Sequence, residues 1–144
     1  MLIYRDRDAI EAARLRRLAV AKAEVVARVN GAVTAARRLY VTELPGQEMV
    51  YMAKETEALR YLSLPEPDLS EYPLLSAEVG ITAPSAHELA QIWANMGALW
   101  RYAAAQIEGM RMTALIAIDA AQNEADLDKI LSALEANPAQ NFAV

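Results

Sequence analysis

The stretch from Arg37 to Leu62 decides the fold of this chain, because a Pro-Gly turn in it separates two strongly helical segments. It reads RRLYVTELPGQEMVYMAKETEALRYL. Pro45 fixes φ, and Gly46 can adopt the positive φ that the third position of a type II turn requires. In the alternative, Thr42 caps a helix whose first turn contains Pro45, where a missing N–H does no harm. The residues around this turn form what we call the corner motif: Arg37, Tyr40, Thr42, Pro45, Gly46, Gln47, Tyr51, Lys54 and Glu57.

Two long segments with heptad spacing flank the corner. The first, residues 8–39, has apolar residues three and four apart with one polar interruption at Lys22. Gly31 within it indicates either close packing against another backbone or a local bend. The second, residues 85–121, opens on a capping box and keeps the same spacing throughout. The residues expected on the helix seam or interface are Leu18, Val25, Val29, Leu89, Trp93, Met96, Trp100, Ile107 and Met110.

Shorter helices are predicted between and after these segments. A middle helix covers residues 47–62, and a helical turn over residues 72–79 stops at Gly80. Asn123 is suited to cap a final helix over residues 124–136. We therefore predict an N-terminal segment with a long basic helix (1–40), a helical domain (41–136) and a tail (137–144).

The predicted fold class is all-α. Glycine and proline are few, there is a single phenylalanine, and hydrophobic residues reach 55% largely through alanine. A lone hairpin of two such long helices would expose much apolar surface to water. We therefore expect an oligomeric helical bundle or coiled coil, with further copies of the chain as its partners.

Charge is distributed unevenly along the chain. Residues 1–40 hold nine Lys/Arg against four Asp/Glu, whereas residues 41–144 hold five against fifteen. The basic end could contact nucleic acid, or it could lie against an acidic surface of the same chain or of a neighbouring copy. We favour the acidic surface, because the basic residues are interleaved with alanine and valine and lack an aromatic platform.

No residue set indicates an enzyme, a metal site or a cofactor. His87 is the single histidine and has no predicted base or nucleophile beside it. Glu124, Asp126 and Asp128 alternate like calcium ligands, but they lack the required Gly and terminal Glu and suit a helix N-terminus better. Tyr40, Tyr51 and Tyr61 either bind a ligand or pack around the corner, and the sequence leaves both open. No run approaches the ~20 apolar residues of a membrane span.

The corner motif resembles a segment of small helical proteins associated with the tails and tail fibres of tailed bacteriophages. The pattern is R-x-x-Y-x-T-x-x-P-G-Q-x-x-x-Y-x-x-K-x-x-E-A, and the similarity extends over residues 37–121. Further matching residues are Tyr61, Leu62, Tyr72, Pro73, Leu74, Leu75, Ala77, Glu78, Gly80, Trp100, Ile107, Glu108 and Arg111.

The resemblance implies a structural part of a virion, located in the tail and made in the host cytoplasm. Its expected partners are other copies of itself, as a trimer if it follows fibre symmetry, and other tail or fibre proteins. One alternative is a tail-fibre assembly chaperone that leaves the particle. A second alternative is a helical nucleic-acid-binding module, which we do not favour.

Overall fold

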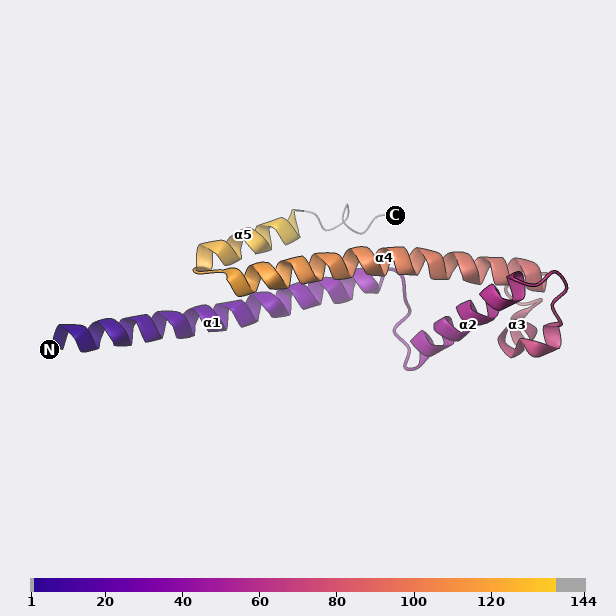
Figure 1. Cartoon of the computed structure of the whole chain (residues 1–144), viewed down its shortest axis with the longest axis horizontal. Coiled ribbons are helices and arrows are strands. Elements are labelled where there is room, and N and C mark those ends of the chain that lie inside the picture. The colour runs from indigo at the N-terminus through magenta and orange to yellow at the C-terminus, as the bar shows by residue number, and fades with distance from the viewer. Residues whose placement is uncertain (1, 137–144) are drawn as a thin grey trace. The chain divides into compact units, whose positions relative to one another are not determined.

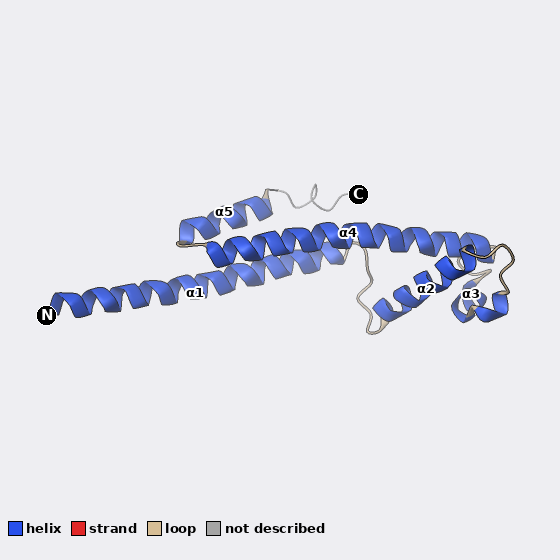
Figure 2. Cartoon of the chain, viewed as in Figure 1, coloured by secondary structure: helices blue, strands red, loops and turns tan. Residues whose placement is uncertain are grey.

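The computed structural model describes residues 2–136, and over that range it consists of helices joined by turns and loops, with no strand, which confirms the all-α prediction (Figures 1 and 2). The predicted tail, residues 137–144, lies outside the described residues. The five α-helices are α1 (Leu2–Arg37), α2 (Gln47–Leu62), α3 (Pro73–Glu78), α4 (Ala86–Ala120) and α5 (Glu124–Glu135), and a 3-10 helix, η1, covers Leu69–Glu71.

The Pro-Gly corner is a type II turn. Gly46 has φ 81° and ψ −9°, and the Gln47 N–H donates to the Leu44 carbonyl at 2.9 Å. Because α2 begins only at Gln47, the alternative in which Thr42 caps a helix containing Pro45 is wrong. The backbone preferences of Pro45 and Gly46 therefore explain the turn that precedes α2.

The long first helix runs farther toward the N-terminus than its heptad pattern indicates. It begins at Leu2 instead of residue 8 and ends at Arg37. Gly31 is exposed, and a methyl group built on it would meet nothing within 4 Å. Of the two alternatives for this glycine, close packing against another backbone therefore does not occur within the described part of the chain.

Two later helices, α4 and α5, begin at the side-chain caps that the sequence predicts. The Asn123 amide oxygen accepts from the Asp126 N–H at 3.0 Å and begins α5. The Ser85 hydroxyl oxygen accepts from the Glu88 N–H at 3.2 Å and begins α4. The Glu88 carboxylate does not complete the predicted capping box, because it accepts from the Ser85 hydroxyl instead of a backbone N–H.

The chain divides into two compact units, which are described separately. Unit 1 contains α1, α5 and residues 105–120 of α4, which lie side by side in Figure 1. Its core is a narrow strip of small and branched side chains: Val25, Val29, Val33, Ala36, Ile107, Ile118, Ala121 and Leu127. Arg14 and Lys22 donate to the carbonyls of Gln122 (3.2 Å) and Asp119 (2.6 Å) at and beyond the C-terminal end of α4, where cations are favoured.

Unit 2 contains α2, η1, α3 and residues 86–104 of α4, together with their connections. Its core cluster contains bulkier side chains than that of unit 1: Ala58, Tyr72, Leu75, Ala83, Leu89, Ala90 and Trp93. Gly80, with φ 85°, turns the chain between α3 and α4, and its N–H donates to the Ala83 carbonyl at 2.7 Å. Helices α2 and α3 thus pack against the apolar face of residues 86–104 of α4.

Between residues 2 and 136, no helix combines the length and the apolar character that a bilayer crossing needs.

Candidate functional site

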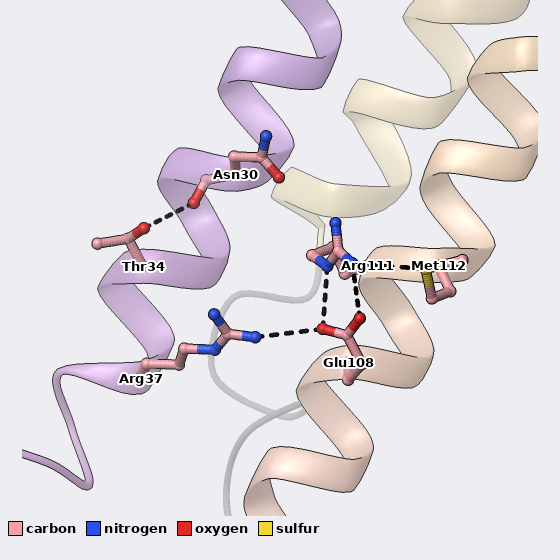
Figure 3. A network of polar contacts seen from close by, with 6 residues as sticks. All are labelled: Asn30, Thr34, Arg37, Glu108, Arg111 and Met112. Carbon is pink, nitrogen blue, oxygen red and sulfur yellow. Dashed lines mark hydrogen bonds and ion pairs between the residues drawn. The ribbon is translucent and has the colours of Figure 1, made fainter. Parts of the chain in front are cut away.

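The first corner residue, Arg37, belongs to a charged network within unit 1 (Figure 3). Its guanidinium contacts the Glu108 carboxylate at 3.2 Å, and Arg111 donates to the same carboxylate at 2.9 and 2.6 Å. The hydrogen bond from Arg111, followed by the positive charges of Arg111 and Arg37, lowers the pKa of Glu108 below its ordinary value despite opposing desolvation. This network ties the C-terminal end of α1 to α4.

The aromatic corner residues contact partners within unit 2. The Tyr51 hydroxyl donates to the Thr42 hydroxyl at 3.2 Å, across the turn. The Tyr40 and Trp100 rings lie 6.2 Å apart with an interplanar angle of 42°. Tyr61 packs edge-on against Tyr72 at 5.2 Å. These contacts favour the packing interpretation of the tyrosines over the ligand-binding one.

Lys54 forms the most protected ion pair of the corner motif. Its ammonium lies 2.5 Å from the Glu78 carboxylate and 4.8 Å from the centre of the Trp93 ring. The Thr82 hydroxyl donates to the same carboxylate at 2.7 Å. Hydrogen bonds from Lys54 and then Thr82 lower the pKa of Glu78. Lys54 therefore fixes α2 to the end of α3 and to α4.

Glu57 provides the N-terminal cap of α3. Its carboxylate accepts from the Leu74 N–H at 3.0 and 3.2 Å and from the Leu75 N–H at 3.0 Å. Pro73 occupies the first turn of α3, and no cap from its own side chains is present at that end. A carboxylate from a different helix thus satisfies the free amides of α3.

Taken together, the corner-motif residues form the turn and hold the neighbouring helices in place. They do not bring reactive side chains together at one point. Its side chains bind other side chains or backbone amides of the same chain. The partners Glu78, Glu108 and Trp93 lie far along the chain, so no local spacing identifies them. The sequence does single out Glu78 and Glu108 through the resemblance and Trp93 through the heptad spacing, but it does not pair any of them with a motif residue.

The predicted seam residues are distributed between the inside and the surface of the single chain. Five of them are buried: Val25, Val29, Leu89, Trp93 and Ile107. Leu18, Trp100 and Met110 are half-buried, and Met96 is 56% exposed. Most of the two seams therefore packs inside the units, and a seam residue that is buried there is not available to a second copy.

An apolar groove in unit 1 runs between α1, α4 and α5. It has a volume of about 490 Å³, and its larger lining side chains are Val29, Val33, Ile107, Met110, Ile130 and Leu134. Arg111 is the one charged residue in its lining, and that side chain is bound to Glu108. The groove therefore lacks the convergent polar groups that orient a small molecule.

Large apolar side chains are exposed on the outer face of α2 and beside the corner. Met49, Met52 and Leu59 are 75%, 71% and 50% exposed, and Leu39 and Leu44 at the corner are 74% and 58% exposed. None of the sequence-based predictions includes this surface. The spacing of Met49, Met52, Thr56 and Leu59 at three, four and three residues is a signal that could have indicated it.

The part of the chain that the structure describes contains no group of three or more acidic or histidine side chains placed to hold a metal ion. Asp126, one of the residues with calcium-like spacing, instead accepts from the Gln122 N–H at 3.0 Å.

Comparison with family models, curated proteins and solved structures finds no match to this chain.

Proposed function

We propose that this chain is a structural component of a tailed-phage virion, associated with the tail or tail fibres. It acts by self-association and by docking to neighbouring virion proteins. The resemblance of residues 37–121 to tail-associated helical proteins supports the phage assignment, and it supports a virion location for the mature protein.

The observation that carries self-association is the amount of large apolar side chain exposed on regular helices. On α2 these side chains are Met49, Met52 and Leu59, and on α4 they include Ile92, Met96 and Leu99. Each set recurs at helical spacing, so it forms a stripe and not a scatter of single residues. Contiguous apolar surface of this kind marks protein contact sites, and burying it contributes about 25 cal/mol per Å².

The contacts that corner-motif side chains make within the chain support a mechanical role. Arg37, Lys54 and Glu57 each join one helix to another. Such links hold the helices at a fixed spacing, which a structural part of an assembly requires. Each of these three charged groups already binds a partner within the chain, which favours a structural role for it over a reactive one.

Two measurements test the proposal. Multi-angle light scattering at micromolar concentration is expected to give a mass above that of one 15.8-kDa chain. Mass spectrometry of purified phage particles is expected to find the protein in fixed copy number. A monomer, or a particle without the protein, contradicts the corresponding half of the proposal.

The assembly-chaperone alternative shares the helices and the self-association. It differs in one outcome, because a chaperone is present in the producing cell and absent from the finished particle. The particle measurement therefore separates the two functions.

A further inference from the structure

We propose that self-association uses two different surfaces, so that the basic outer face of α1 in one copy docks on the outer face of α2 in a second copy. This inference rests on the proposed function, and it adds which surfaces meet and with what symmetry.

The donor surface is the outer face of the first half of α1. Ile10 and Val20 are 64% and 60% exposed, and Arg17 lies between them at helical spacing. Arg7, Arg16 and Arg17 are exposed and have no hydrogen bond or ion pair with any residue in the described range 2–136. Figure 1 shows α1 continuing past the turn that joins α4 to α5, where no other described helix of unit 1 lies beside it.

These three arginines differ from the other cations of α1. Arg14 is bound to Glu11 and to the Gln122 carbonyl, Lys22 to the Asp119 carbonyl, and Arg28 to Glu135. Unit 1 thus binds Arg14, Lys22 and Arg28 internally, whereas Arg16 and Arg17 form no ion pair with any of the described residues.

The acceptor surface is the outer face of α2, where Met49, Met52 and Leu59 form the exposed stripe. The carboxylate of Glu48 lies beside its first turn, is exposed, and has no partner among the described residues. Glu66 and Glu71, which follow α2 in the chain, are likewise exposed carboxylates without a described side-chain partner.

The charges of the two surfaces are complementary. Residues 38–104 hold four Lys/Arg against nine Asp/Glu, whereas α1 holds eight Lys/Arg against four Asp/Glu. The four cations of unit 2 are all engaged: Arg38 with Glu43, Lys54 with Glu78, Arg101 with Glu55, and Arg60 with the Glu71 carbonyl. The uncompensated acidic charge of unit 2 therefore attracts an external basic surface, and it sets both partner choice and association rate.

The apolar residues of the two faces share a spacing. Ile10, Ala13, Arg17 and Val20 follow steps of three, four and three, as do Met49, Met52, Thr56 and Leu59. Two helices whose stripes have the same repeat can pack along several turns. Because donor and acceptor differ, each pair of copies retains one free donor surface and one free acceptor surface, so the assembly can grow into a ring or an extended array.

The test uses one variant for each surface. Arg17→Glu removes the donor and Glu48→Lys removes the acceptor, and each alone is expected to weaken association by about tenfold or more and to give mostly monomer. Mixing the two variants is expected to restore association, because the intact donor of one variant meets the intact acceptor of the other. Asp128→Lys, a charge reversal at an exposed α5 carboxylate, is the matched control and is expected to assemble like the wild type.

The possible outcomes separate this inference from the proposed function. A wild-type monomer overturns self-association itself. A wild-type oligomer that persists in both variants overturns this pairing while self-association stands. A loss of association in both variants that mixing does not restore overturns the two-surface arrangement. A donor variant that loses only retention on duplex DNA, with its mass unchanged, assigns the arginines to nucleic acid instead.

Discussion

The two units of this chain hold their helices together in different ways. Unit 1 buries a narrow strip of Val, Ala and Ile, and its cations bind exposed carbonyls and carboxylates. Unit 2 buries Tyr72, Leu75 and Leu89 completely and places a carboxylate on the free amides of α3. The difference shows that short helices need bulky side chains and long-range caps, whereas long helices form regular backbone structure with little of either.

The largest effect is expected from truncating the core of unit 2. Leu89→Ala should lower the free energy of unfolding by about 3 kcal/mol, because Leu89 is fully buried and its loss leaves a cavity. Tryptophan fluorescence during denaturation measures it, since Trp93 and Trp100 both belong to unit 2. Ile81→Ala, at an 80% exposed position, is the control and should change stability by about 0.5 kcal/mol or less. Equal effects of the two changes would show that Leu89 is not part of a packed core.

A matched pair of glycine substitutions compares the units directly. A methyl group at Gly97 in unit 2 would overlap the Glu55 carboxylate, whereas one at Gly31 in unit 1 would meet nothing within 4 Å. Gly97→Ala should therefore gain little or no stability, because the Glu55 carboxylate must move to make room, whereas Gly31→Ala should stabilise by about 0.5–1 kcal/mol through helix propensity. Thermal unfolding followed by far-UV circular dichroism measures both. Stabilisation by Gly97→Ala as large as that by Gly31→Ala would contradict the close approach of Glu55.

Ion pairs of the two units should also differ. Glu78→Gln is expected to cost about 1–2 kcal/mol, because the side chains of Lys54 and Glu78 are only 19% and 26% exposed and a charged hydrogen bond is lost. Glu135→Gln removes the Arg28 pair, whose side chains are 55% and 64% exposed, and should cost about 0.5 kcal/mol or less. Urea denaturation of both variants decides the comparison, and the reverse ranking would refute it.

Acid should weaken unit 2 through the same carboxylate. The pKa of Glu78 is lowered by Lys54 and Thr82, so its contribution to stability is present above its unfolded pKa and is lost as the pH falls through the folded value. Stability followed by tryptophan fluorescence should therefore decline below about pH 4.5, and Glu78→Gln should flatten that decline. Asp128→Asn, at an exposed carboxylate of α5, should leave the profile unchanged.

The smallest effect is expected at Tyr72. Its ring is fully buried, but its hydroxyl has no hydrogen-bond partner within the described residues. Tyr72→Phe should therefore change stability by no more than about 0.5 kcal/mol, or raise it, because an unpaired buried polar group costs free energy. A loss of about 2 kcal/mol in denaturation would reveal a partner for that hydroxyl.

Local residues predicted much of the fold. The all-α class, the type II turn at Gly46, the start of α2 at Gln47 and the Asn123 cap of α5 each follow from a few neighbouring residues. Such signals need no distant partner, which is why sequence reasoning finds them. The heptad pattern predicts that α1 starts at residue 8, whereas the helix begins at Leu2. The pattern misses these six residues because it weakens toward the N-terminus while the helix continues.

Tertiary structure decided what those residues do. Glu57 and Lys54 could be identified as motif members, but their partners at Leu75 and Glu78 are brought near only when α2 packs on α3. Periodicity also could not tell that Val29 and Ile107 are buried within one chain while Met52 faces outward. Helical spacing defines a face of a helix, and only the packing of the whole chain determines which neighbour that face meets.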